Sequence, residues 1–244
     1  MPILRKLRYQ LGWILCLSAV TIGIISESAL AQVDSRIQFN PPKGGAPSDT
    51  RGGSSRGNGS CAQSAANLAK RLTLLTPANS NFGLTVAERP TFFAYIPPTA
   101  AQKAFFSLND ASGNLYYQTL IAIPKTGGIV RIELPPSLPA IAIGQPYQWG
   151  IALLCADRLR PDSPFVNGWI QRIEPSQNLM QQLRTTSEID QVALYSTSGI
   201  WYDTVETLFR LRRQQPNDLQ LDSSWNNLLQ SAGLDTIVAE PVKK

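Results

Sequence analysis

The stretch that decides the fold is residues 143–155, which read Ile-Gly-Gln-Pro-Tyr-Gln-Trp-Gly-Ile-Ala-Leu-Leu-Cys. From Tyr147 onward, every second residue up to Cys155 is apolar or aromatic. A period of two is typical of a β-strand with one buried face. We therefore place Tyr147 and Trp149 on the core face of a strand, and we expect Trp149 to be a core residue rather than a platform for a ligand.

The turn before this strand indicates the class of β fold. A glycine turn followed by a tyrosine that enters a strand resembles the tyrosine corner of immunoglobulin and fibronectin type III domains. In that corner the phenol hydrogen-bonds to backbone upstream of the tyrosine. We expect the same contact for Tyr147.

Other segments of strand length lie on both sides of this stretch, at residues 91–96, 103–110, 115–123, 129–134 and 165–173. Glycine, proline and asparagine turns separate them, and one is a predicted hairpin turn over 110–114 with Gly113 at positive φ. Short strands joined by hairpin-like turns favour an antiparallel sheet over a parallel one. We predict an immunoglobulin- or fibronectin-like β-sandwich over residues 61–174.

After Pro175 the apolar spacing changes to three and four residues, which predicts helices over residues 175–237. A helical hairpin with Trp201 on one arm and Trp225 on the other is expected to pack on the sandwich. Pro216 is expected to end the first helix, Asp222 or Ser223 to be the N-cap of the second, and Gly233 to end the second. The fold class is therefore mixed β and α, with a tail over residues 238–244.

Residues 1–31 have the three-part layout of a cleaved secretory signal, with a basic start, an apolar run and a small-x-small triplet ending at Ala31. The apolar run, 11–25, is shorter than the ~20 residues that a membrane-spanning helix needs. We expect cleavage after Ala31, export, and no transmembrane helix in the mature chain. Removing three basic residues and one acidic residue lowers the net charge from +5 to +3, which weakens the case for a nucleic-acid partner.

Residues 32–60 are rich in glycine, serine, proline and arginine, a composition that predicts a disordered linker. Cleavage would leave two cysteines, Cys61 and Cys155, in an oxidising compartment. An even pair there favours a disulfide. The alternative is two buried free thiols.

Composition excludes most catalytic chemistry. The 244 residues include no histidine and three cysteines, so Ser-His-Asp and Cys-His nucleophile systems and histidine-ligated metals are absent. We expect no metal and no cofactor. An enzyme would have to use carboxylates, and the candidates are Glu88, Asp157, Asp162 and Asp203. No catalytic residue is assigned, because no motif of known mechanism is present.

Two motifs combine flat aromatic area with hydrogen-bonding groups, a mixture that is favoured at recognition surfaces. We interpret them as candidate binding residues: Trp169, Gln171 and Arg172 in one motif, and Trp201, Tyr202 and Asp203 in the other. The alternative is that both tryptophans fasten the helices to the sheet.

Three stretches together carry a family resemblance. They are residues 83–97 (Gly-Leu-Thr-Val-Ala-Glu-Arg-Pro-Thr-Phe-Phe-Ala-Tyr-Ile-Pro), 168–173 (Gly-Trp-Ile-Gln-Arg-Ile) and 199–203 (Gly-Ile-Trp-Tyr-Asp). In this order they resemble domain-of-unknown-function family 928, a group of exported, largely cyanobacterial proteins. The resemblance implies a β-plus-helical module in the periplasm or on the outer surface of a Gram-negative-type bacterium. It implies no activity, because the family has no assigned catalytic residues.

These observations lead to the hypothesis of an exported, non-enzymatic binding or adaptor module that recognises a protein or glycan of the cell envelope. One alternative is a carboxylate-dependent hydrolase of envelope polysaccharide. Another is a scaffold subunit of an envelope or secretion-associated complex. The sequence leaves the oligomeric state open.

Overall fold

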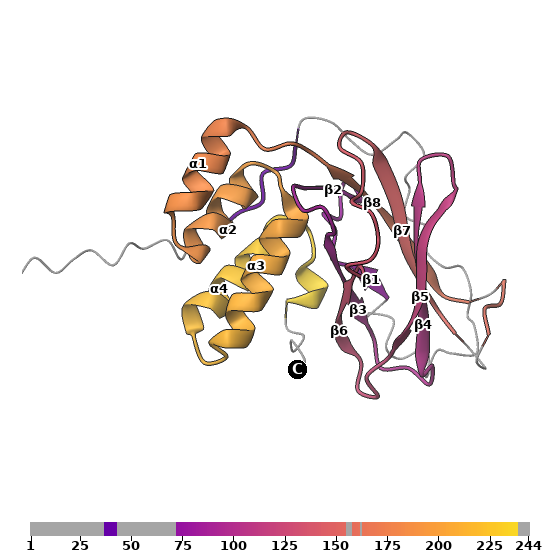
Figure 1. Ribbon diagram of the computed structural model, residues 1–244. Coiled ribbons are helices and arrows are strands. Elements are labelled where there is room, and N and C mark those ends of the chain that lie inside the picture. Colours follow the sequence, from indigo (N-terminus) through magenta and orange to yellow (C-terminus); the bar gives the residue numbers. More distant parts are fainter. Residues whose placement is uncertain (1–36, 43–71, 155–157, 162, 239–244) are drawn as a thin grey trace, which may run out of the picture. The chain divides into compact units, whose positions relative to one another are not determined.

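The strand that carries Tyr147 and Trp149 is β7, Pro146–Leu153, and it lies in the middle of a five-stranded sheet. The computed structural model (Figure 1) describes residues 37–42, 72–154, 158–161 and 163–238. Trp149 is fully buried. The Tyr147 hydroxyl accepts a hydrogen bond from the Ala142 backbone N–H at 3.2 Å. The predicted core position of Trp149 and the phenol-to-backbone contact are both confirmed.

The described strands form two sheets. The five-stranded sheet has the order β2-β8-β7-β4-β5, and the three-stranded sheet has the order β1-β3-β6. The remaining strands are β1 (Thr73–Leu74), β2 (Phe82–Thr85), β3 (Thr91–Ile96), β4 (Lys103–Asp110), β5 (Leu115–Ala122), β6 (Gly128–Glu133) and β8 (Phe165–Arg172).

The pairing is antiparallel at every strand pair except β2 with β8, which run parallel. The six predicted strand segments correspond to β3 through β8. The predicted hairpin turn joins β4 to β5, with Gly113 at φ 84°. Sequence periodicity missed β1 and β2, which are two and four residues long, too short to show an alternation.

Both faces of β3 are buried, which explains its uninterrupted apolar sequence. Phe92 contacts Phe106 and Trp149 of the five-stranded sheet, with ring centroids 5.2 and 4.8 Å away. Phe93 points the other way and contacts Phe209 at 4.8 Å. The three-stranded sheet therefore lies between the helices and the five-stranded sheet (Figure 1).

The described C-terminal part forms four α-helices and a short 3-10 helix, Asp235–Ile237. The α-helices are α1 (Gln177–Thr185), α2 (Glu188–Thr197), α3 (Trp201–Gln214) and α4 (Leu219–Ser231). The predicted hairpin corresponds to α3 and α4. None of the helices in the described ranges is long and apolar enough to cross a membrane.

The N-cap of α4 differs from the one predicted from the sequence. Asp218, and not Asp222 or Ser223, accepts hydrogen bonds from the backbone N–H groups of Gln220 and Leu221. The Asp222 side chain instead accepts hydrogen bonds from Arg212 of α3, at 2.9 and 2.7 Å. This ion pair links the two arms of the hairpin.

A second correction concerns residues 37–42, which fall inside the predicted disordered linker. Ile37 and Phe39 are buried in the core. The Asn40 N–H donates to the Ser196 carbonyl at 3.1 Å, and the Ser196 hydroxyl donates to the Gln38 carbonyl at 2.7 Å. These six residues thus pack beside α2. The rest of 32–60, the segment 1–31, Cys61 and Cys155 lie outside the described residues, so cleavage and the disulfide stay predictions.

Candidate functional site

The six sequence-predicted binding residues fall on two neighbouring elements. Three are in β8 and three form the first turn of α3. The start of α3 packs against β2, which is paired with β8. A side chain at Gly83 of β2 would lie 2.9 Å from both Trp201 and Tyr202, so the glycine allows this close approach.

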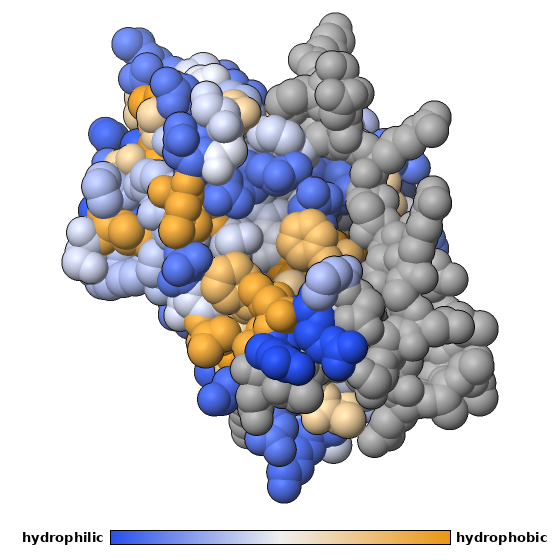
Figure 2. Space-filling view, turned by 90° about the vertical axis from the view of Figure 1, so that its right-hand side faces the viewer, coloured by the Kyte–Doolittle hydropathy of each residue, from blue (hydrophilic) through white to orange (hydrophobic). Residues whose placement is uncertain are grey.

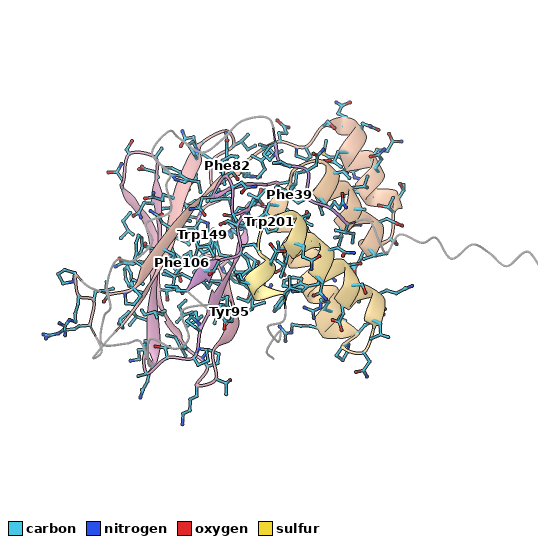
Figure 3. The ribbon with its side chains drawn as sticks, turned by 180° about the vertical axis from the view of Figure 1, so that it is seen from behind. Phe39, Phe82, Tyr95, Phe106, Trp149 and Trp201 are labelled. Carbon is cyan, nitrogen blue, oxygen red and sulfur yellow. The ribbon has the colours of Figure 1, made fainter. Side chains whose placement is uncertain are left out.

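Trp201 is fully buried at this junction. Its indole Nε1–H donates to the Leu75 carbonyl at 2.7 Å. The ring meets Phe39 edge-on, with centroids 4.8 Å apart (Figure 3). Both the polar and the apolar parts of this side chain are therefore used by contacts within the chain.

Tyr202 connects α3 to two strands of the five-stranded sheet. Its hydroxyl accepts a hydrogen bond from Trp149 Nε1 at 2.6 Å and donates one to the Trp169 carbonyl at 3.1 Å. Burial raises the pKa of this phenol far above its ordinary value. The hydroxyl thus stays neutral and acts as donor and acceptor at once, so both buried partners are satisfied.

Asp203 ties the same helix turn to the end of β2. Its Oδ2 accepts hydrogen bonds from the Thr85 hydroxyl at 2.8 Å and from the Val86 N–H at 3.1 Å. Burial raises the pKa of this carboxyl to about 6, although these hydrogen bonds oppose the shift. Glu206, one turn further along α3, adds repulsion that raises it further.

On β8, Gln171 and Arg172 hold the loop that precedes β7. Gln171 Nε2 donates to the Gly144 carbonyl at 2.7 Å, and Arg172 donates to the Ile141 carbonyl at 3.2 Å. Arg172 also pairs with Glu88 at 3.5 Å. These contacts fix the turn through which the chain enters β7.

Trp169 lies on the other face of β8 from Gly168, whose α-carbon faces Leu74 of β1. It is 9% exposed, and its Nε1 has no hydrogen-bond partner in the described part of the chain. The structure therefore places the six residues on different sides of the β8–α3 junction. This arrangement matches the fastening interpretation for Trp201. Trp169 instead lies on the face of β8 that points away from β1.

The carboxylates that a hydrolase would use are held in other contacts where they are described. Glu88 pairs with Arg89 as well as Arg172, and Asp203 binds Thr85 and Val86. Asp157 and Asp162 lie outside the described residues. Within the described ranges, no group of three or more cysteine or acidic side chains is placed to hold a metal ion.

An open depression of about 300 Å³ lies beside α3. It is lined by Arg131, Glu206, Phe209, Arg210, Arg213 and Gln214. Arg131 clamps Glu206 with two hydrogen bonds of 3.1 and 2.6 Å, and Arg210 pairs with Glu188 of α2 at 2.9 Å. Most of its charges are already neutralised, so the depression is a weak candidate for an ionic ligand.

The outer face of the five-stranded sheet is a feature that the sequence motifs did not indicate. The register places three cross-strand rows there, each running from β5 through β4 and β7 to β8. They are Leu120–Phe105–Ala152–Phe165, Gln118–Ser107–Gly150–Asn167 and Leu115–Asn109–Gln148–Trp169. None of these residues is charged.

Exposure on this outer face is greatest toward β5. Leu115 and Leu120 are 55% and 54% exposed, and Phe165 is 38% exposed. Figure 2, which views the molecule from the side of β4 and β5, shows apolar side chains gathered there. No local pattern marks this face in the sequence, because each of its rows joins residues of four different strands. An exposed apolar cluster of this kind is a candidate interaction surface.

Comparison with known proteins adds the family but no activity. No curated protein matches the chain. One solved structure, a beta-glucuronidase of Parabacteroides merdae with glycerol in its active site, aligns at 8% identity with a TM-score of 0.29. That alignment covers 68% of this chain and 27% of the other, so the chain spans about a quarter of that enzyme's length. The family model described as Domain of Unknown Function (DUF928) matches residues 51–242, and the chain belongs to this family.

Proposed function

We propose that this protein is an exported binding module of the cell envelope and that the outer face of its five-stranded sheet takes a protein partner. The observation that carries the proposal is the apolar row Leu120–Phe105–Ala152–Phe165, which crosses four strands without a charge. Monomeric proteins rarely expose contiguous apolar surface of this kind unless it is used.

Phe165 is the anchor of this row. A side chain at Gly150 would lie 2.6 Å from the Phe165 ring, so the ring rests directly on the backbone of β7. Glycine in a strand often marks such a close approach. One face of the ring thus packs on the backbone at Gly150, while the side chain remains 38% exposed. This is expected of an aromatic residue that a partner covers.

The next row supplies uncharged hydrogen-bonding groups. The side chains of Gln118, Ser107 and Asn167 have no hydrogen bond in the described part of the chain. Amides and hydroxyls both donate and accept, so they suit the backbone of an extended segment. The aliphatic exposure of Leu115 and Leu120 favours a protein partner over a glycan, because interfaces between proteins bury apolar side chains at their centre. The partner should present an apolar, uncharged strip.

The location is part of the proposal. The layout of residues 1–31 supports export to the periplasm or the outer surface. An immunoglobulin-like sandwich is likewise proposed for the two facing sheets, supported by the contact of Tyr147 with Ala142. NMR contacts between strands that do not follow the orders β2-β8-β7-β4-β5 and β1-β3-β6 would overturn that part.

The test is site-specific photo-crosslinking in intact cells, with a photoreactive phenylalanine analogue at Phe165 and, as the matched control, at Leu219. Leu219 is the most exposed large apolar residue described, at 78%, and it lies at the start of α4. We expect one envelope protein to be captured from position 165 and not from position 219, and the capture to be lost in Asn167→Asp. Equal capture from both positions, or retention of the protein on envelope glycans with no protein captured, would overturn the proposal.

A further inference from the structure

Strand β5 is an unguarded sheet edge. It has eight residues, reads Leu-Tyr-Tyr-Gln-Thr-Leu-Ile-Ala, and contains no charge and no proline. Among the described strands it pairs only with β4. Natural edge strands are commonly protected by charges, prolines, shortness or a covering element, because an open edge pairs with other chains.

The other edges of the two sheets are protected in these ways. β1 has two residues. β2 has four and is contacted by α3. β6 carries Arg131 and Glu133, which form an ion pair of 2.7 Å. β5 therefore differs from every other described edge.

The register identifies which backbone groups of β5 are free. The Ile123 N–H donates to the Gln102 carbonyl at 2.9 Å, in line with the β4–β5 pairing. Because antiparallel pairs alternate between bonded and non-bonded, the N–H and C=O groups of Gln118, Leu120 and Ala122 point away from β4. No hydrogen bond is recorded for these groups in the described part of the chain.

We propose that β5 pairs with β5 of a second copy of this chain, antiparallel about a two-fold axis at Leu120. Leu120 then lies opposite Leu120 of the second copy, and Gln118 lies opposite Ala122. Each free N–H meets a free C=O in this register, since the three residues are spaced symmetrically around the axis. The two five-stranded sheets become one continuous sheet.

A second copy fits because the edge is complementary to itself. A charged strand would place like charges opposite each other, but β5 has none. Leu120, 54% exposed, would be covered by its own counterpart. Pro124, which has no N–H, follows the strand and ends the pairing. The nearest charge on the outer face, Lys103, lies opposite Ala122 at the end of the paired segment.

The test is sedimentation equilibrium of the protein isolated from its own cells, with variants that place charge on the two-fold axis. The wild type should have twice the mass of one chain. Leu120→Lys and Leu120→Glu should each have the mass of a single chain, because like charges then oppose each other. An equimolar mixture of the two variants should regain the double mass, which a folding defect could not produce.

Leu219→Lys is the control, since it adds the same charge at an exposed residue far along the sequence in α4, and it should retain the double mass. A single-chain mass for the wild type at high concentration would overturn the proposal, as would a double mass for Leu120→Lys alone. Leu120 belongs to both proposed surfaces, but the two tests are separable: the mass of the protein reports on pairing at β5, and crosslinking at Phe165 reports on a partner at β8.

Discussion

Two regions of the molecule use their polar groups differently. One is the junction between α3 and the sheets, and the other is the outer face of the five-stranded sheet. At the junction, Trp201, Tyr202 and Asp203 direct every hydrogen bond recorded for their side chains to another part of the same chain. On the outer face, Gln118 and Asn167 have no side-chain hydrogen bond in the described residues.

The contrast shows that residue type alone does not distinguish a recognition surface from an internal joint, meaning a contact that holds helix and sheet of the same chain together. Aromatic side chains with hydrogen-bonding groups are suited to both. What separates the two regions is whether partners are already present and whether apolar area is covered. Trp201 is fully buried, whereas Leu120 is more than half exposed.

The largest effect should come from Trp201→Ala. This change removes the hydrogen bond to the Leu75 carbonyl and the contact with Phe39, and it leaves a cavity in the core. We expect the free energy of unfolding to fall by about 4 kcal/mol, measured by denaturant titration. A loss below ~1 kcal/mol would show that the junction is not a structural joint.

The next effect tests the leucines on the two faces of the β4–β5 hairpin. Leu108→Ala removes a fully buried side chain from β4, so it should cost about 3 kcal/mol. Leu120→Ala, measured in a dilute single-chain sample, should change the free energy of unfolding by less than ~0.5 kcal/mol. Similar costs at the two positions would contradict the assignment of inner and outer faces.

Tyr202→Phe should have a smaller effect than the core deletions. The ring remains in place, but Trp149 Nε1 and the Trp169 carbonyl lose their shared partner. An unsatisfied buried donor costs about 2 kcal/mol. Tyr195→Phe, at a partly exposed phenol on α2, is the control and should be nearly neutral. Equal losses for both variants would argue against the Tyr202 bridge.

The last prediction of the series is a pH dependence at Asp203. Its pKa is raised from 3.8 to about 6 in the folded state, so the folded chain binds more protons than the unfolded chain between these values. The free energy of unfolding should therefore fall as the pH rises through this window, by on the order of 3 kcal/mol at most. Asp203→Asn should remove this part of the pH dependence in denaturation curves recorded between pH 4 and pH 7. An unchanged curve would show that Asp203 ionises as freely as in the unfolded chain.

The sequence predicted the local part of the fold. Alternation and turn residues located β3 through β8, and the spacing around Trp201 and Trp225 located α3 and α4. The packed segment 37–42 was missed because its two prolines resemble a linker, while its partner Ser196 lies more than 150 residues away. Long-range pairing also decides that β2 runs parallel to β8.

The candidate site was harder to predict for the same reason. The internal partners of Trp201 and Tyr202 are 126 and 53 residues away in the sequence, so their role as joints depends on the folded chain. The outer face comes from strand order, since Leu120 and Phe165 become part of one row only through β4 and β7. Neither relation is contained in a local pattern.

Hydrogen exchange at residue resolution in a dilute, single-chain sample tests the contrast between the two regions most directly. We predict that the indole N–H groups of Trp149 and Trp201 are protected, and that the backbone N–H groups of Gln118, Leu120 and Ala122 exchange rapidly, with Thr119 and Ile121 protected between them. Rapid exchange at the two indoles, or protection of all five consecutive amides in the single chain, would contradict this assignment of an internal joint and an open edge.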